Sequence, residues 1–154
     1  MSTLWKMKIM LAVIGFLRIP IIGFVRPKLV MLDEKTVRVL ICLRRRTKNH
    51  LGSMYFGALS VGADIAGGLH AFYFADKLNK KISFSFKSMN ANFIKRAESD
   101  VTFDCSDGIL VREALSRAIE YGERINQVVK VMAFDNSQEK VAEFEMIISI
   151  KNLI

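Results

Sequence analysis

The chain has 154 residues, enough for one domain with a substantial core, and about half of them are apolar and a quarter charged, as is typical of a globular protein. Two cysteines exclude a disulfide framework, and two histidines without a cysteine cluster do not form a metal motif, so we expect no metal and no cofactor. The net charge of +8 leaves three partners open: an anionic membrane surface, a phosphorylated small molecule or nucleic acid. Zinc-finger spacing and an aromatic-rich basic strand are both missing from the sequence, which argues against nucleic acid.

The beginning of the chain is strongly apolar. Residues Ile9–Val25 are hydrophobic enough to suggest a signal peptide or a membrane span, but Arg18 and Pro20 interrupt the run, and its length is at the lower limit for a span. We therefore favour an apolar helix within residues 1–26 that packs on a single domain core at residues 28–154. Such a helix could also rest on a membrane surface. We expect the protein to be cytoplasmic.

After this segment the hydrophobic period alternates between that of strands and that of helices. The predicted strands are 28–32, 37–43, 82–86, 101–105, 126–134 and 141–151, and the predicted helices are 53–75 and 109–120. Asp107 is the expected N-cap of the second of these helices, and residues 135–137 are typical of a hairpin turn. Consecutive strands with short connections predict an antiparallel sheet, and a sheet with one buried helix is an α+β fold.

The predicted helix at residues 53–75 is apolar nearly all round and rich in glycine. Glycines inside a buried helix suggest that another backbone or a ligand approaches closely. Because the sheet can cover only one side of such a helix, something else must cover the rest, and a second copy of the chain is the economical answer.

Asp64 is the only Asp, Glu, Lys or Arg between Leu51 and Ala75. Burying a lone carboxylate is costly, and desolvation raises its pKa. One interpretation is a general base or nucleophile at the bottom of a ligand channel. The other is a structural carboxylate that caps or pairs with a neighbouring strand or subunit, because ion pairs perturb acids too.

Helical spacing suggests what surrounds this acid. One stripe carries only small or polar residues and could floor a groove: Ser53, Gly57, Ser60, Asp64, Gly68 and Ala71. The opposite side is expected to pack on the sheet through Phe56, Leu59, Leu69 and Phe74.

The start of the same helix is a second candidate feature. Free backbone N–H groups there suit a developing negative charge, and Gly57 would let a ligand approach them, although helix packing explains this glycine equally well. Asn49 could cap the helix or orient a water or substrate carbonyl, and a cap or loop role is favoured. His50 could act as an acid or base but sits in a loop, whereas His70 is expected to pack.

These residues lie in the segment Arg46-Thr47-Lys48-Asn49-His50-Leu51-Gly52-Ser53-Met54-Tyr55-Phe56-Gly57-Ala58-Leu59, which with Ala63-Asp64 resembles the signature of hotdog-fold thioesterases. The resemblance extends over most of the chain and points to the DUF4442 branch, which is related to the phenylacetate-pathway (PaaI-like) thioesterases. It implies a hotdog fold in which a curved antiparallel β-sheet wraps a long central helix, with an extra N-terminal helix. It also implies a homodimer with active sites at the subunit interface, and a tetramer is left open.

Carried over by position, the resemblance implies that Asp64 is the catalytic acid, that the backbone N–H of Gly57 polarises the thioester carbonyl, and that Asn49 also belongs to the site. Tyr55-Phe56-Gly57 stands where better-studied relatives have His-Gly-Gly. Further candidates for contact with the substrate are His50, Tyr55, Phe56, Ser60, Gly68, Phe93, Arg46, Lys95 and Arg96. The basic members of that set, with Arg44 and Arg45, would hold the phosphates of the leaving group.

The expected activity is hydrolysis of an acyl-CoA or acyl-carrier thioester, in which Asp64 activates a water or attacks the carbonyl itself. The alternative is a non-catalytic acyl- or lipid-binding protein of the same fold. A hydratase or dehydratase is a third hypothesis, but such enzymes usually need a histidine with an acid at the site, and only His50 could serve.

Overall fold

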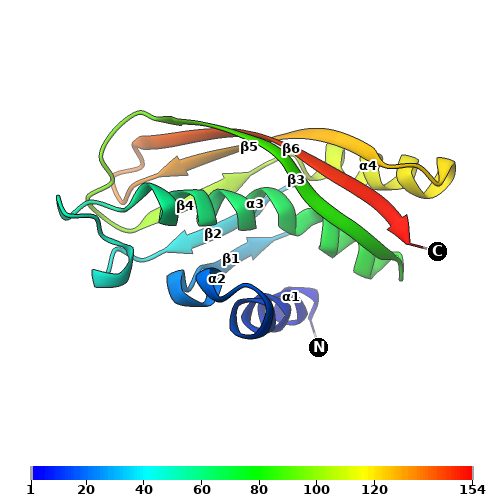
Figure 1. Ribbon diagram of the computed structural model, residues 1–154, viewed down its shortest axis with the longest axis horizontal. Helices are drawn as coiled ribbons and strands as arrows, with labels where there is room; N and C mark the ends of the chain where they lie inside the picture. Colours follow the sequence, from blue (N-terminus) through cyan, green and yellow to red (C-terminus); the bar gives the residue numbers. More distant parts are fainter. Residues whose placement is uncertain (1, 154) are drawn as a thin grey trace.

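The computed structural model describes residues 2–153, and its centre is a six-stranded antiparallel sheet (Figure 1). In spatial order the strands are β1 (Lys28–Leu32), β2 (Val37–Ile41), β4 (Val101–Cys105), β5 (Ile125–Phe134), β6 (Lys140–Leu153) and β3 (Lys81–Phe93). β1 and β3 are therefore the two edge strands. β3 pairs with β6 along almost its whole length, from Lys81 opposite Leu153 to Phe93 opposite Ala142.

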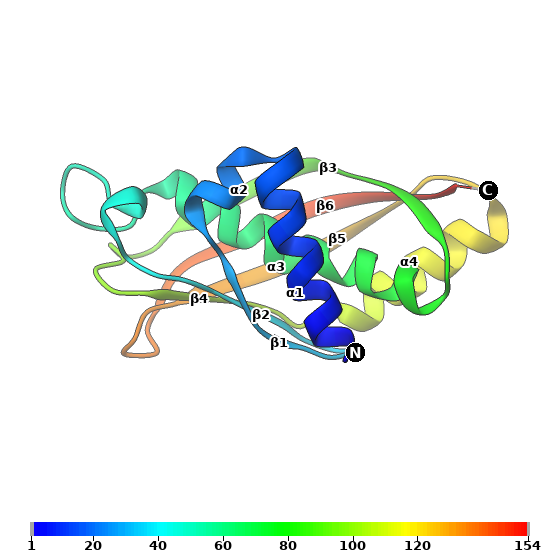
Figure 2. The same ribbon diagram turned by 90° about the horizontal axis from the view of Figure 1, so that it is seen from below.

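The sheet curves around one long helix, α3 (Phe56–Lys77) (Figures 1 and 2). Alternate residues of β2 and β4 are fully buried, which explains the period of two in their sequences. The glycines of α3 allow the helix to approach the sheet, because a Cβ atom on Gly62 would lie 2.4 Å from the ring of Phe103, and one on Gly67 would lie 2.5 Å from the Cε of Met146. These two glycines meet side chains of the chain's own sheet, and neither another backbone nor a ligand is needed to explain them.

The second predicted helix is α4 (Gly108–Tyr121), which packs one apolar face on α3, β5 and β6. Asp107 is the N-cap residue, as predicted, but its side chain makes no capping hydrogen bond to the helix. It accepts instead from the backbone N–H of Lys130 at 2.7 Å, and so ties the start of α4 to β5.

The apolar N-terminal segment is two helices and not one. α1 (Thr3–Val13) continues into a π-helical turn (Ile14–Arg18), and α2 (Pro20–Val25) begins at the proline, which suits the first position of a helix. α1 and α2 lie on the side of α3 away from β5 and β6 (Figures 1 and 2). Within the described residues, no helix is long and apolar enough to cross a membrane.

The two cysteines are free thiols on neighbouring parts of the sheet. Cys105 is fully buried on β4, and burial raises the pKa of its thiol to about 12. Cys42 follows β2 and is only partly buried. Cys105 has neither the low pKa nor the exposure of a reactive thiol, and Cys42 has no cationic partner among the described ion pairs, so we look for the site elsewhere.

Candidate active site

The Asp64 carboxyl is partly buried and has no partner. Desolvation raises its pKa from 3.8 to about 6, and desolvation is the only cause of the increase. No side chain within residues 2–153 forms an ion pair with it or donates a hydrogen bond to it, so this chain does not supply the partner that the structural interpretation needs. A carboxyl with a pKa this near neutrality suits general base catalysis.

The accessible stripe of α3 runs at intervals of four residues. Its partly or fully exposed members are Phe56, Ser60, Asp64, Phe72 and Asp76, with Gly57 beside the first. The prediction that Phe56 packs on the sheet is wrong, because Phe56 precedes Ser60 by four residues and therefore shares the face of Asp64. Phe56 is 58% exposed.

The other predicted members of the stripe are placed differently. Gly68 is buried beneath β3, since a Cβ atom there would lie 3.1 Å from the ring of Phe84 and 3.3 Å from that of Phe86. Ala71 is fully buried, and Ser53 lies before the helix begins. The Ser60 hydroxyl donates to the carbonyl oxygen of Phe56 at 2.9 Å. The stripe is therefore narrower than predicted, and it begins at an aromatic residue, Phe56, and ends at Asp76.

The beginning of α3 leaves backbone donors open. The N-cap residue Tyr55 makes no side-chain cap, and the first hydrogen bond of the helix runs from the N–H of Leu59 to the carbonyl oxygen of Tyr55. The N–H groups of Phe56, Gly57 and Ala58 thus point out of the helix with the positive end of its dipole. This is the arrangement expected of an oxyanion site.

The Tyr55 ring lies against Gly57. A Cβ atom on Gly57 would lie 2.5 Å from the ring's Cε1 atom, so only glycine allows the ring to lie there. The ring also contacts that of Phe56, whose centroid is 4.7 Å away. Phe56 in turn is 6.2 Å from Phe93 at the end of β3. Tyr55, Phe56 and Phe93 form an exposed group, which we call the aromatic cluster, beside the helix start.

The Asn49 side chain makes its hydrogen bonds within the loop before the helix. Its side-chain oxygen accepts from the N–H groups of Leu51 at 2.9 Å and Ser53 at 3.2 Å, and its amide nitrogen donates to the Ser53 hydroxyl at 3.0 Å. These bonds agree with a loop role, and the N-cap of α3 is Tyr55. His50, in the same loop, is exposed.

His70 is on the buried side of α3, as expected. Its Nε2 lies 2.9 Å from the carbonyl oxygen of Asp33, and its ring stacks on Phe74 at 5.7 Å. Burial lowers the pKa of this histidine, which keeps it neutral. It therefore does not supply the histidine that a dehydratase site needs near Asp64.

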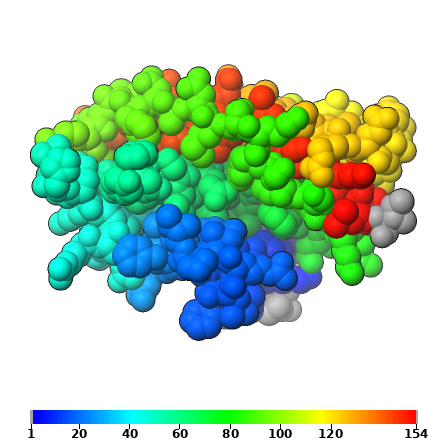
Figure 3. All heavy atoms as spheres, viewed as in Figure 1, coloured from blue at the N-terminus to red at the C-terminus, as the bar shows by residue number. Residues whose placement is uncertain are grey.

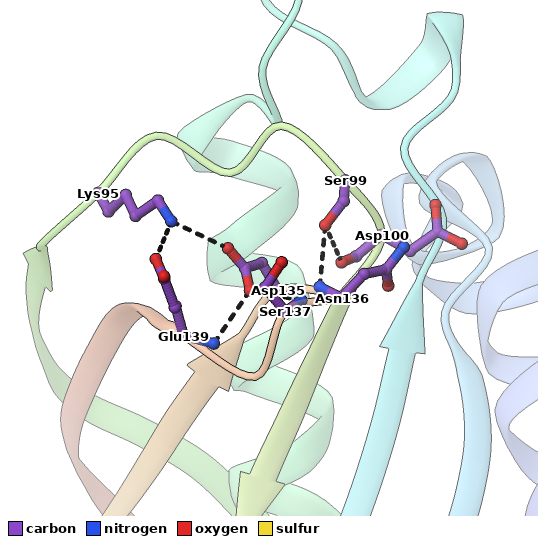
Figure 4. Close-up of polar contacts among 7 residues, drawn as sticks. All are labelled: Lys95, Ser99, Asp100, Asp135, Asn136, Ser137 and Glu139. Carbon is purple, nitrogen blue, oxygen red and sulfur yellow. Dashed lines mark hydrogen bonds and ion pairs between the residues drawn. The ribbon is translucent and has the colours of Figure 1, made fainter.

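The basic candidates are dispersed. Lys95 forms ion pairs with Asp135, at 3.3 Å, and with Glu139, both in the turn between β5 and β6 (Figure 4). The hydrogen bond from the backbone N–H of Glu139 holds the pKa of Asp135 below its usual value, so the turn stays negative. The charge of Lys95 is therefore already balanced. The Arg96 guanidinium lies 3.4 Å from the Glu98 carboxylate and also donates to the carbonyl oxygen of Leu51 at 3.1 Å.

Arg46 belongs to a different surface. It lines a hollow of about 940 Å³ formed mainly by the N-terminal helices, together with Lys8, Arg26 and Lys28. A second hollow, of about 460 Å³, lies between α1 and the end of α3. Asp64 and Gly57 line neither of them, so one chain alone does not enclose the predicted substrate channel. Among residues 2–153 no group of three or more His, Cys, Asp or Glu side chains is arranged to hold a metal ion.

Sequence reasoning missed two features near these residues. Phe84 and Phe86 of β3 cover Gly68, and Phe72 stands 5.2 Å from Phe84. Alternation in β3 showed that these rings share a face, but not that the face meets Gly68. The basic hollow under the N-terminal helices was also missed, because its residues are spread from Lys8 to Arg46.

Comparison with known proteins gives one family and a set of similar folds. The family described as "Domain of unknown function (DUF4442)" matches residues 8–150. No curated protein matches the chain at a significant level.

Three solved structures illustrate the fold. A protein of unknown function from Chlorobaculum tepidum TLS has a TM-score of 0.83 at 13% identity, with 97% of this chain and 94% of that one covered. A protein from Pseudomonas aeruginosa described as a probable thioesterase has a TM-score of 0.74 at 20% identity, with coverages of 94% and 95%. A thioesterase from Haemophilus influenzae has a TM-score of 0.66 at 14% identity, with coverages of 87% and 84%. At such identities the likeness establishes the fold alone.

Proposed function

The chain belongs to the DUF4442 family and has the hotdog fold, and on that premise we propose that it hydrolyses acyl-coenzyme A or acyl-carrier thioesters with Asp64 as general base or nucleophile. The observation that carries the proposal is the Asp64 carboxyl itself, which is partly buried, has no hydrogen-bond or ion-pair partner within residues 2–153 and has a pKa of about 6. The names of two of the similar structures, a probable thioesterase and a thioesterase, support the same class of reaction.

The raised pKa supports a role as a base at neutral pH. A carboxyl with a pKa of about 6 is roughly nine-tenths ionised at pH 7, yet it accepts a proton far more readily than an ordinary aspartate does. Asp64 would take a proton from a water that attacks the thioester carbonyl, and the thiolate of coenzyme A or of a carrier's pantetheine would leave. In the nucleophilic variant the carboxylate attacks the carbonyl and water then hydrolyses the anhydride.

A single chain does not bring the two halves of this site together. Gly57 and Asp64 are seven residues apart on α3, which corresponds to about 10 Å along the helix axis. One thioester carbonyl cannot contact both the Gly57 N–H and the Asp64 carboxylate of the same copy. We therefore propose that Gly57 of one copy and Asp64 of another form each site in a homodimer.

The exposed edge of the sheet supports this assembly. β3 is a 13-residue edge strand, and Met89 and Phe93 expose large apolar side chains along it. A long apolar edge strand invites pairing with another chain. The aromatic cluster lies at the end of this strand and would be partly covered in the dimer.

The Tyr55 ring favours the alternative, a non-catalytic acyl-binding protein. The ring packs against the Gly57 Cα, so a substrate bound at the Gly57 N–H would have to share the helix start with the ring or displace it. Because Tyr55 is about half exposed, such a movement costs little. Under the alternative the ring stays, the aromatic cluster binds the acyl chain and no hydrolysis follows.

An acyl-CoA hydrolysis screen separates these possibilities. The wild-type protein should hydrolyse at least one acyl-CoA, and Asp64→Asn should lower kcat by about 100-fold or more, as expected on loss of a general base. Asp76→Asn is the matched control, because Asp76 lies on the same stripe but is paired with Lys6. Unchanged turnover in Asp64→Asn would disprove the mechanism, and acyl-CoA binding without any turnover by the wild type would favour the non-catalytic alternative.

A further inference from the structure

The N-terminal helices form a tight corner. Gly15 in the π-helical turn and Gly23 in α2 approach so closely that a Cβ atom on Gly15 would lie 2.9 Å from the backbone nitrogen of Gly23. A Cβ atom on Gly23 would lie 2.3 Å from the carbonyl oxygen of Gly15. Backbone contact of this kind holds the segment of residues 14–25, which we call the N-terminal corner, in one conformation.

The corner directs large apolar side chains away from the domain. Phe16 is 85% exposed, and Leu17, Ile21 and Phe24 are each more than half exposed. In Figure 3 the N-terminal residues, in blue, form a ridge that projects from the body of the molecule. Exposed apolar groups this numerous on so short a segment mark an interaction surface.

α1 extends this surface. Trp5, Ile9 and Val13 are exposed at intervals of four residues and so form a single apolar face. The inner face of α1 is apolar too, since Met7 and Leu11 are buried in the core. The outer face is therefore not needed for folding, and it is continuous with the corner through Phe16 and Leu17.

The charge of the segment has one sign. Residues 1–32 contain the five basic residues Lys6, Lys8, Arg18, Arg26 and Lys28, and the first acidic residue of the chain is Asp33. Lys6 pairs with Asp76, whereas within residues 2–153 the other four make no ion pair.

Some of these charges surround the hollow beside the corner. Lys8, Arg26, Lys28 and Arg46 line it together with apolar side chains. Its volume of about 940 Å³ is large enough for a phosphate head group and part of an acyl chain. The surface thus combines an apolar ridge with unpaired positive charge.

We propose that this surface docks on an anionic phospholipid bilayer, with the apolar residues of the corner and of α1 in the interface and the basic residues on lipid phosphates. An apolar helical face flanked by Lys and Arg binds in this way, about 5–10 Å deep at the boundary between head groups and acyl chains. A second copy of the chain is a poor occupant, because two such surfaces would bring like charges together. No described helix spans a membrane, so the contact is peripheral.

The test uses the whole protein with two kinds of vesicle, one of phosphatidylcholine alone and one that also contains phosphatidylglycerol. The protein should sediment with the anionic vesicles, and less so as salt is raised. Trp5 is the only tryptophan of the chain and lies on the docking face, so its emission should shift to shorter wavelength on binding. Neutral vesicles should bind much less.

Two pairs of variants locate the contact. Phe16→Ser with Leu17→Ser should weaken binding by about tenfold or more, since both side chains leave the interface. Arg18→Gln with Arg26→Gln should weaken it by about 25-fold, at about fivefold for each charge near the surface. Matched controls carry comparable changes elsewhere. Tyr121→Ser removes an exposed large side chain at the end of α4, and Lys87→Gln with Arg117→Gln removes the same charge as the Arg18 and Arg26 pair.

The outcomes are distinct from those of the hydrolysis screen. Asp64→Asn should bind vesicles like the wild type, so a failed screen leaves this proposal standing. The proposal is overturned if anionic vesicles leave the Trp5 emission unchanged, or if the control pair of charges matters as much as Arg18 and Arg26. Self-association that depends on Phe16 and Leu17, without vesicle binding, would assign the surface to a second copy instead.

Discussion

Replacing Asp64 by asparagine should stabilise the protein at neutral and higher pH. In the folded chain burial raises the pKa of this carboxyl from 3.8 to about 6, with no compensating partner. Each tenfold change in proton affinity is worth about 1.4 kcal/mol, so the ionised carboxylate lowers the free energy of unfolding by about 3 kcal/mol. Asparagine has almost the same shape and no charge, but it has its own desolvation cost, so the expected gain is about 1–3 kcal/mol.

The pH dependence of this gain follows from the direction of the shift. Below about pH 3.8 the carboxyl is protonated in both the folded and the unfolded chain, and the substitution should change little. Between the two pKa values the unfolded chain ionises first, so the wild type loses stability as pH rises. Above about pH 6 the folded chain ionises as well, and the difference becomes constant.

Urea unfolding of wild type and Asp64→Asn at about pH 8 and about pH 4.5 measures this difference. The gain in the free energy of unfolding from asparagine should be about 2 kcal/mol larger at the higher pH. The midpoint temperature of thermal unfolding at about pH 8 should rise by several degrees. Asp76→Asn removes a charge paired with Lys6 at the surface, and should cost 0–1 kcal/mol, roughly, with no gain at high pH. A gain from Asp64→Asn that is equal at both pH values would refute an elevated pKa at this residue.

Three further predictions concern the glycines of α3 and the edge of the sheet. Gly62→Ala should lower the free energy of unfolding in urea by about 1–3 kcal/mol, because its Cβ would lie 2.4 Å from the fully buried Phe103 ring. In a protein that also carries Phe103→Leu, a smaller loss of stability would confirm that contact with the ring is the cause, and an equal loss would exclude it. In Gly57→Ala the added Cβ would lie 2.5 Å from the Tyr55 ring, but that ring is about half exposed and can move. The free energy of unfolding should therefore change by less than about 1 kcal/mol, whereas thioester hydrolysis should be lost. Met89→Asp should convert a dimer to a monomer in sedimentation velocity, since like charges would meet across the β3 edge; an unchanged dimer would place the interface elsewhere.

Most of the architecture follows from local patterns in the sequence. Alternation predicted β2, β4, β5 and β6 to within a few residues, and the continuous apolar run predicted α3, because burial on one face or on all faces leaves a direct trace in the sequence. β3 was predicted too short. Most of its residues from Ser88 onward are polar or exposed, so they show no alternation, and they form a strand by pairing with β6.

Errors arose where a side chain has a choice of partners. Asp107 occupies the predicted N-cap position, but its side chain bonds to Lys130, which is 23 residues away, and not to the helix. Lys95 looks like a free cation in the sequence, yet its partners Asp135 and Glu139 come from a turn some forty residues later. Such pairings depend on the register of β5 and β6, which no local pattern reveals.

Asp64 was singled out from the sequence because it is an exception to an otherwise uniform pattern. The sheet covers one side of α3 and the N-terminal helices approach another, so the stripe through Ser60 and Asp64 is what the fold leaves open (Figures 1 and 2). The only charge between Leu51 and Ala75 lies on that stripe, where it reduces stability and has no partner within the described part of the chain. A polar uncharged residue would fit the same space at a lower cost. Since the carboxylate weakens the fold that holds it, we propose that it is kept for what would bind against the stripe under the proposed function: a thioester, and a second copy of the chain that contributes its own Gly57.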